Sequence, residues 1–397
     1  MPTQINRTLN FLPYTFLLTR AILLLSLPIE GLRGYGDFIH FYRLAGMGWP
    51  FVDLWVEFPP IFPNISALLY QFVGSRQHAY DYLLVLLLTL CDAANIAIFV
   101  RLFNRLHPSG GQWLRALVYT AILSGLAYGW WFFDPLAVLF MLLATHWFFE
   151  RNDWGTGLAM GLGALTKWFP ILFLPIVWKV RPPRQAVRIT AITLFMLVLV
   201  YGGLYFLSPQ MTAASLGAQG SKGSWETVWA LLDGNFQTGN FGPEIERYDS
   251  QAAFTLRGKP ALIPSWLALI PFVIVGGWLW WKARLDGERQ MLAFFGLTWC
   301  LFLLWSPGWS PQWVLYLLPL ILLVLPQREA LLMALALVFI NLLEWPLLLS
   351  RGYNWGLWLT IPMRTLLLVL LAFEFWRTIQ NPLADPAAVN AMSQETI

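Results

Sequence analysis

The sequence predicts an all-α polytopic membrane protein, a bundle of about 10–12 transmembrane helices with two long extracytoplasmic loops. Hydrophobic residues make up 58% of its 397 residues, and the mean hydropathy is +0.60. Charged residues make up 12%, about half of the roughly 25% found in soluble domains. The 23 tryptophans suit the headgroup zone of a bilayer. These observations indicate that lipid is the main solvent of the chain.

About twelve apolar segments are candidate spans, because a spanning helix needs about 20 apolar residues. They are 11–29, 82–100, 116–132, 135–149, 154–165, 168–178, 189–207, 264–281, 291–305, 312–326, 329–348 and 357–376. Those between 116 and 178 are short or interrupted by charges and proline, so they could be re-entrant. The first segment contains Arg20 and lacks a small-residue cleavage site, so we expect a retained helix rather than a signal peptide.

The distribution of charge predicts the orientation of these spans. Lys and Arg gather in short loops, whereas most acids lie in two long polar segments, about 30–81 and 208–263. By the positive-inside rule the short loops and both termini are cytoplasmic, and both long segments are extracytoplasmic. Residues 1–376 then form one membrane domain, and residues 377–397 form a disordered cytoplasmic tail.

Composition also argues against several classes of protein. No run of basic residues forms an arm or stripe, so we expect no nucleic-acid partner. Cys91 and Cys300 both lie in apolar segments, which argues against a disulfide framework or a zinc site. No internal repeat supports an inverted-repeat transporter.

The first long segment contains an aspartate at the predicted start of a helix. Gly34 to Gly36 suit a turn, Asp37 follows, and His40 lies one helical turn further on. Asp37 could simply cap the helix. It could also act as a general base that faces a cavity at the membrane surface. The sequence leaves both interpretations open.

Two further acids follow in the same segment. Pro59-Pro60 ends any helix and holds Glu57 in extended backbone. Asp53 and Glu57 could ligate a divalent metal, but there is no Asp-x-Asp and no His close to them in sequence. We therefore predict no metal site and no cofactor. Solvated loop acids are the simpler interpretation, more so for Asp53 than for Glu57.

Two charges stand at the ends of spans in the middle of the chain. Asp134 precedes Pro135, so it could cap the next helix. Lys167 lies between apolar runs near the predicted outer face, and a charge inside a span costs roughly 2.5–3.5 kcal/mol on insertion scales. Lys167 could extend to the interface beside Trp168, or it could bind a lipid phosphate, which we favour.

Arg20 and Arg364 are charges inside predicted spans. They could bind phosphate, or they could pair with Asp92, Glu344 or Glu374 in the bundle. The sequence does not choose between these alternatives.

The second long segment contains a possible anion site. Glycine and serine surround Lys222, and their backbone N–H groups could wrap an anion. Trp225 could stack on a sugar ring. A loop with incidental polar residues is the alternative. Gln312 lies further on, in the predicted outer turn 306–313 between two spans.

These motifs, in this order, resemble the polyprenol-phosphate-dependent glycosyltransferases of the GT-C superfamily, above all glycosyltransferase family 87, formerly a domain of unknown function. The matching residues are Asp37, Gly48-Trp49-Pro50-Phe51, Glu57-Phe58-Pro59-Pro60, Lys167-Trp168-Phe169-Pro170, Ser306 to Gln312, and Leu317-Leu318-Pro319. The missing Asp-x-Asp is a departure that bears on metal dependence.

The resemblance implies a GT-C-like bundle that moves a sugar, commonly mannose or another hexose, from a polyprenyl-phosphate donor to an extracytoplasmic lipid or glycan acceptor with inversion. Asp37 would be the catalytic base. The implied substrate-binding residues are His40, Glu57, Asp134, Lys167, Lys222, Trp225 and Gln312. Lys167 would neutralise the departing lipid phosphate. A carboxylate close to Lys167 would be held as a salt bridge, so we expect a gap between it and the base. The implied location is a bacterial inner membrane.

Two other functions predict different sequence features. A transporter or flippase of lipid-linked sugars predicts charged residues along helices at the bilayer midplane and broken helices in both halves. Here the polar residues concentrate in the outer segments instead. A non-catalytic scaffold leaves Lys167 and the order of the motifs unexplained. The sequence therefore favours a transferase.

Overall fold

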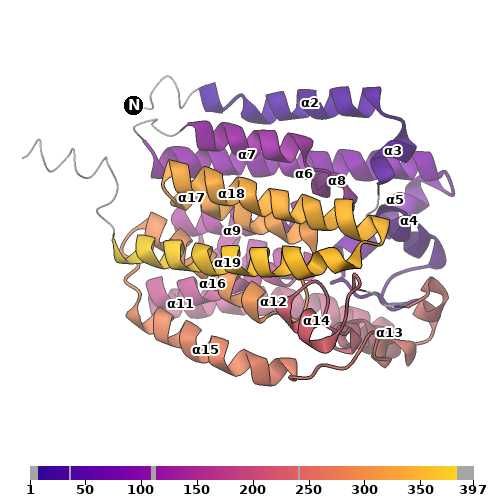
Figure 1. Cartoon of the computed structure of the whole chain (residues 1–397). Helices are drawn as coiled ribbons and strands as arrows, with labels where there is room; N and C mark the ends of the chain where they lie inside the picture. The colour runs from indigo at the N-terminus through magenta and orange to yellow at the C-terminus, as the bar shows by residue number, and fades with distance from the viewer. Residues whose placement is uncertain (1–7, 35–36, 109–112, 240–241, 382–397) are drawn as a thin grey trace, which may run out of the picture.

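The computed structural model describes residues 8–34, 37–108, 113–239 and 242–381 (Figure 1). Throughout these ranges the regular secondary structure is helical. The predicted Gly34–Gly36 turn falls partly on residues 35 and 36, which lie outside the described residues. The all-α prediction is confirmed for the described part of the chain.

Five stretches of helix in the described residues are long and apolar enough to cross a membrane. They are α6 (Gln77–Leu106), α12 (Pro183–Leu207), α15 (Ser265–Lys282), Gln327–Arg351, which begins with α18 (Gln327–Leu342), and Asn354–Gln380, which contains α19 (Leu357–Gln380). Other helices occupy the remaining predicted segments: α2 (Leu12–Ser26), α7 (Leu114–Gly125), α9 (Asp134–Phe149), α10 (Asp153–Thr166), α11 (Leu174–Val180), α16 (Glu288–Trp305) and α17 (Val314–Val324). This pattern confirms a polytopic membrane protein.

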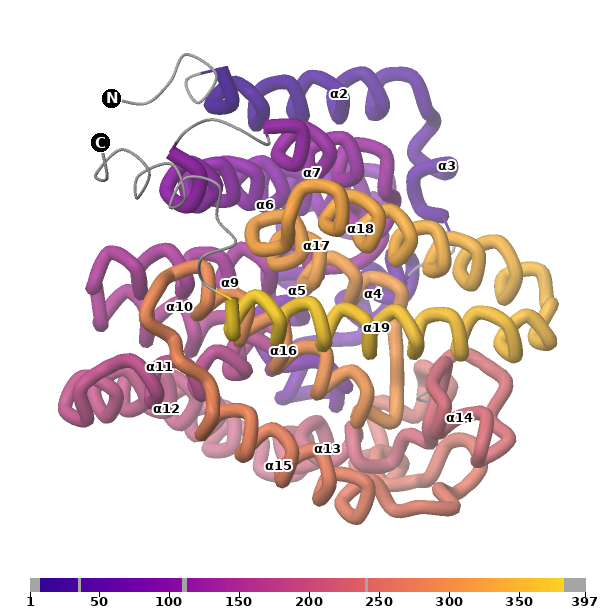
Figure 2. Tube along the Cα trace, turned by 60° about the vertical axis from the view of Figure 1, so that its left-hand side comes forward, coloured from indigo at the N-terminus to yellow at the C-terminus, as the bar shows by residue number. Residues whose placement is uncertain are grey.

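Burial separates core helices from helices on the periphery. The most apolar stretch of α6 is 67% buried, whereas those of α12 and α15 are only 11% buried. Their exposed side chains are apolar, for example Phe195 on α12 and Ile274 on α15. Both helices lie along one flank of the bundle (Figure 2). Since a large contiguous apolar surface marks a membrane or protein contact, and both helices are long and apolar enough to cross a membrane, α12 and α15 mark a lipid-facing flank.

Small residues on α10 allow the close packing that positions the end of this helix. A Cβ atom at Gly157 would lie 2.8 Å from Ile192 of α12, and one at Gly161 would lie 2.8 Å from Met196. Glycine at these positions lets the two backbones approach closely. The tight α10–α12 contact fixes the C-terminal end of α10, where Lys167 follows.

The two long polar segments contain helices of their own. The first holds α3 (Ile29–Arg33), α4 (Phe38–Met47) and α5 (Ile61–Val73), and the second holds α13 (Pro209–Gly217) and α14 (Val228–Asp233). Both segments lie at one end of the bundle, opposite the start of α2 and the end of α19 (Figure 1). They are therefore close enough to build one site.

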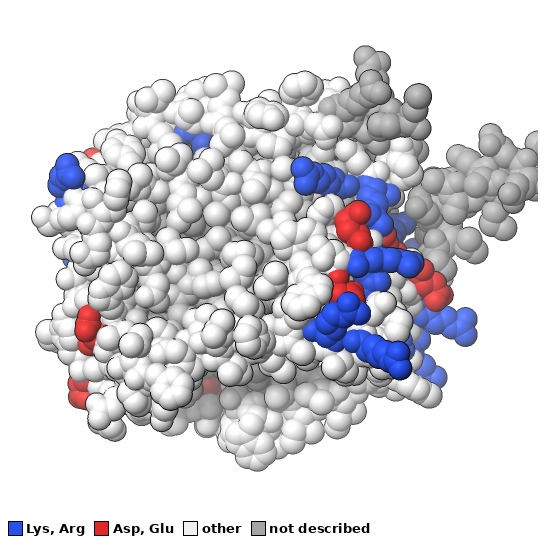
Figure 3. All heavy atoms as spheres, turned by 180° about the vertical axis from the view of Figure 1, so that it is seen from behind, with Lys and Arg blue, Asp and Glu red and all other residues white. Residues whose placement is uncertain are grey.

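On the face that Figure 3 shows, Lys and Arg gather mainly at one end of the molecule, with Asp and Glu among them. The positive-inside rule concerns such a gathering of Lys and Arg, and acids contribute little to it. The last helix, α19, continues to Gln380, past residue 376, where the membrane domain was predicted to end. Residues 382–397 of the predicted tail lie outside the described residues.

Candidate active site

A cavity of about 1240 Å³ opens at the end of the bundle that carries the long segments. Both segments contribute to its wall, together with the residues after α10 and the turn after α16. The predicted site residues that line it are Asp37, His40, Glu57, Lys167, Lys222, Trp225 and Gln312. Asp134 is not part of the lining. The structure thus brings together residues that are far apart in the sequence.

Asp37 stands at the N-cap position of α4, as the sequence predicts. Its backbone has φ −74° and ψ 8°, and its side chain makes no capping hydrogen bond to the described residues of α4. The simple capping interpretation is therefore wrong. Burial raises the pKa of Asp37, and the cations around it only partly oppose that shift. A carboxylate with a raised pKa is a stronger base.

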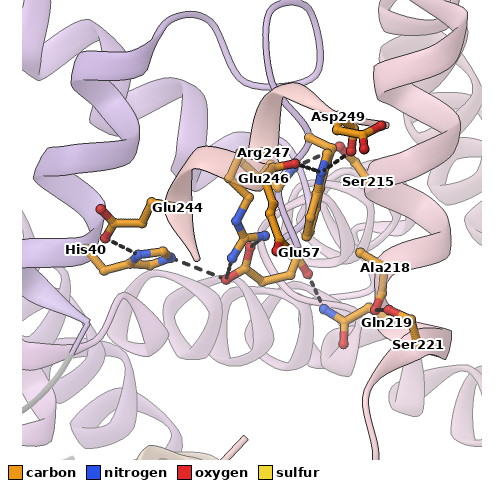
Figure 4. Close-up of polar contacts among 12 residues, drawn as sticks. His40, Glu57, Ser215, Ala218, Gln219, Ser221, Glu244, Glu246, Arg247 and Asp249 are labelled. Atoms are coloured by element: carbon orange, nitrogen blue, oxygen red, sulfur yellow. Dashed lines mark hydrogen bonds and ion pairs between the residues drawn. The ribbon is translucent and has the colours of Figure 1, made fainter. Parts of the chain in front are cut away.

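His40 and Glu57 belong to a polar network that joins the two long segments (Figure 4). Arg247 donates to Glu57 Oε2 over 2.6 Å and is 1% exposed. His40 Nε2 lies 3.4 Å from Glu57 Oε1, and His40 Nδ1 lies 3.1 Å from Glu244 Oε1. Gln219 also donates to the carbonyl oxygen of Glu57. Glu57 therefore has a structural role as a clamp between the segments.

The charges in this network are mutually stabilising. Burial alone lowers the pKa of His40, but hydrogen bonds and charges, chiefly those of Glu57, outweigh it and raise the pKa to about 9. Burial alone raises the pKa of Glu57, but Arg247 and His40 lower it to about 2. At neutral pH both His40 nitrogens therefore carry protons and donate to carboxylates.

Lys167 lies in the cavity wall, directly after α10, in extended backbone. Its ammonium donates to Asp134 Oδ1 over 2.7 Å. The rings of Phe133, Phe169 and Trp313 surround it, with centroids 5.0, 5.6 and 6.0 Å from Nζ. The side chain is only 12% exposed, so Lys167 is held inside the wall rather than extended to the interface.

This arrangement corrects two expectations about neighbours of Lys167. Trp168 does not accompany the ammonium but stacks on Tyr201, with centroids 5.8 Å apart. The Asp134 carboxylate accepts from Lys167 through Oδ1, and its second oxygen, Oδ2, is buried. The expected separation from carboxylates therefore fails for Asp134. Asp37 and Lys167 form no ion pair within the described chain, and the expected gap between them stays a prediction.

The cavity wall contains a second cation, Lys222, which lies over the ring of Trp225. Lys222 Nζ lies 3.6 Å from the centroid of the Trp225 ring. Burial lowers the pKa of Lys222 to about 8, although the nearby carboxylates of Glu57 and Asp37 oppose that shift. Trp225 is fixed in turn, because its N–H donates to Pro307 and its carbonyl accepts from Trp309. The second long segment is thereby tied to the turn after α16.

Gln312 belongs to that turn, in the short 3₁₀ helix Pro311–Trp313. Its side chain is 7% exposed, and its Oε1 atom has no hydrogen-bond partner in the described part of the chain. Buried polar atoms normally have a partner. An unsatisfied amide in a cavity wall is therefore well suited to bind a polar ligand.

The sequence model of Glycosyltransferase family 87 matches residues 59–307. The chain belongs to glycosyltransferase family 87. Comparisons with curated proteins and with solved structures give no match. The matched region contains Lys167, Lys222 and Trp225, whereas Asp37 and His40 precede it and Gln312 follows it. Membership of the family confirms that the chain is a glycosyltransferase.

The charges inside the spans of this family 87 protein pair with acids. Arg20 Nη2 lies 4.0 Å from Asp92 Oδ2, and Arg364 Nη1 lies 2.5 Å from Glu344 Oε1. All four side chains are almost fully buried. Of the two alternatives left open by the sequence, the structure favours ion pairing over phosphate binding.

Asp53 and Glu57 do not meet in this glycosyltransferase. The Asp53 carboxylate accepts from the N–H of Trp49 over 2.8 Å and closes a local loop, while Glu57 binds Arg247. Across the described ranges, no group of three or more His, Cys, Asp or Glu side chains is placed to hold a metal ion.

Sequence reasoning missed several residues of the cavity wall. Arg247, Glu244 and Glu226 all line the cavity, and all come from the second long segment. Arg247 and Glu57 are 190 positions apart, so no local spacing could have joined them. The only available signal was charge complementarity between two loops that share one end of the bundle.

Proposed function

We propose that this glycosyltransferase moves a hexose, with mannose the expected sugar, from a polyprenyl-phosphate donor to an extracytoplasmic lipid or glycan acceptor, inverting the anomeric carbon. The observation that supports this most is the composition of one cavity. It combines a basic carboxylate, Asp37, with two cations, Lys167 and Lys222, in one wall.

In the proposed step, the acceptor hydroxyl oxygen attacks the anomeric carbon on the face opposite the phosphate. The bond between that carbon and the phosphate oxygen breaks, and its electron pair leaves with the polyprenyl phosphate. Asp37 takes the proton of the acceptor hydroxyl. Lys167 and Lys222 stabilise the negative charge that develops on the departing phosphate.

A lipid donor fits the apolar part of the cavity. Trp168, Ile171 and Leu172 line it beside α10, and Phe302 and Trp305 line it on α16. These side chains border the flank on which α12 and α15 expose apolar surface. A polyprenyl chain could therefore stay in lipid while its phosphate reaches the cations. We place the protein in a bacterial inner membrane, with this cavity on the extracytoplasmic side.

The test is transfer by the purified protein from radiolabelled polyprenyl-phosphate hexoses to a panel of lipid and glycan acceptors. Asp37→Asn should lower kcat by about 10²-fold or more, as expected for loss of a general base. Its thermal unfolding in detergent should match that of the wild type.

Glu30→Gln is the matched control, because Glu30 is an exposed acid of the same segment, pairs with the exposed His78 at 3.1 Å, and does not line the cavity. It should keep wild-type activity. An Asp37→Asn variant as active as the wild type would remove Asp37 as the base. A wild-type protein that transfers no sugar but moves lipid-linked sugars across vesicles would replace the transferase with a transporter.

A further inference from the structure

Glu226 lines the cavity, and none of the roles proposed so far uses it. The residue is 2% exposed, and its Oε2 atom has no hydrogen-bond partner among the residues described. Its φ is +53°, in the left-handed region that residues other than glycine seldom adopt. Such a conformation costs on the order of 1–3 kcal/mol and persists only where the surroundings enforce it.

The surroundings hold Glu226 from three directions. The guanidinium of Arg364 donates to its carbonyl oxygen. On one side, Trp225 exchanges backbone hydrogen bonds with the turn at Pro307. On the other side, Thr227 Oγ1 donates to the Pro307 carbonyl over 3.0 Å. These contacts fix the backbone of Glu226, so its carboxyl group has a set position in the wall.

The surroundings of the carboxyl group also favour its neutral form. Burial raises the pKa of Glu226 well above its usual range. The charge of Glu344 and a hydrogen bond with it raise the pKa further, and the charges of Arg364 and Lys222 only partly oppose this shift. Oε2 is the oxygen that has no partner among the described residues. A protonated carboxyl group presents both an O–H donor and a carbonyl acceptor. A sugar hydroxyl, which also donates and accepts, is a better partner for it than a phosphate or a cation.

We infer that Glu226 is a specificity-determining residue that hydrogen-bonds a hydroxyl group of the transferred sugar. The inference rests on the proposed function. Glu226 directly follows Trp225, and the Lys222 ammonium lies over the ring of Trp225. If Lys222 binds the donor phosphate, the neighbouring carboxyl group reaches the sugar attached to that phosphate rather than the polyprenyl chain.

The test uses a set of polyprenyl-phosphate sugars, each lacking one ring hydroxyl, and compares kcat/KM for the wild type, Glu226→Ala and Glu226→Gln. In the wild type, kcat/KM for one deoxy donor should be lower than for the complete donor by about 10²-fold or more, because the absent hydroxyl leaves a buried carboxyl group unpaired. In Glu226→Ala the same deletion should cost less than about 3-fold. Glu226→Gln keeps one donor and one acceptor, so it should retain the wild-type ranking of donors.

Glu246→Gln, a change to a half-exposed acid of the same segment that is bonded to Arg257, is the control and should leave the ranking of deoxy donors unchanged. If Glu226→Ala lowers kcat/KM by the same factor for every donor, the inference is overturned and Glu226 has a structural role. If Glu226→Ala does not fold, Glu226→Met keeps the volume without the hydrogen bonds. A wild type that transfers sugar but tolerates every single deletion would overturn the inference alone, whereas a wild type that transfers nothing would overturn the proposed function.

Discussion

The protonation state of Lys222 should set the alkaline end of the pH range in which the enzyme is active. Its pKa is lowered to about 8, so the ammonium is present below that pH and is lost as pH rises through it. Because the proposed role is to stabilise the donor phosphate, kcat/KM for the donor should fall above about pH 8. Lys222→Arg should move this alkaline limb upward, since a guanidinium stays charged in this range.

The measurement is a pH–rate profile of wild type and Lys222→Arg at low donor concentration. The acid limb should be the same in both, because it belongs to Asp37, whose pKa is raised and whose carboxylate must be unprotonated to act as a base. An alkaline limb at the same pH in both proteins would assign that limb to another group.

At the residue scale, the types of side chain could be predicted but their partners could not. Lys167 was singled out because a charge among apolar residues requires a reason, and it does lie in the cavity wall. Its bond to Asp134 was missed, since the two residues are 33 positions apart. Glu226 gave no local signal, because its strain and its unsatisfied oxygen exist only in the folded chain.

The clamp between Glu57 and Arg247 is the contact that holds the first long segment on the second. Glu57→Gln would leave the guanidinium of Arg247, which also packs on Trp55, buried without its counter-charge. Removing one partner of a buried ion pair destabilises a protein by roughly 3–5 kcal/mol. We therefore expect Glu57→Gln to lower the thermal stability in detergent markedly.

The matched comparison is Glu246→Gln, which removes the partner of Arg257 in the same segment. Both side chains of that pair are partly exposed, and exposed pairs contribute about 0–1 kcal/mol. Glu57→Gln should therefore lower Tm clearly more than Glu246→Gln does. Equal, small shifts would mean that the Glu57–Arg247 pair does not hold the segments together.

At the scale of helices, length and apolar composition predicted the spans well but missed α5. This helix, Ile61–Val73, lies inside the first long segment. With 13 residues it is shorter than the roughly 20 needed to cross a bilayer, so a search for spans passes over it. It forms because one face packs on α4, with Phe62 and Ala67 buried, while Phe72 stays exposed.

At the scale of the whole molecule, the most informative prediction was the grouping of polar segments. The distribution of acids and bases predicted that segments 30–81 and 208–263 share one end, and they do (Figure 1). The pairing of side chains across that end could not be predicted, because it depends on the packing of α3, α4, α13 and α14. The gathering of Lys and Arg in Figure 3 is the feature on which the predicted orientation rests, and the orientation itself stays a prediction.

The measurement that tests this arrangement most directly is labelling of single cysteines in intact cells with a membrane-impermeant thiol reagent. Ser75→Cys reports on the first long segment, Gln251→Cys on the second, and Arg184→Cys on the basic end; all three positions are exposed, whereas the native Cys91 and Cys300 are buried. Positions 75 and 251 should react in intact cells, and position 184 only after the membrane is permeabilised. Reaction of 75 and 251 from opposite sides, or of 184 alone in intact cells, would contradict a single extracytoplasmic active site.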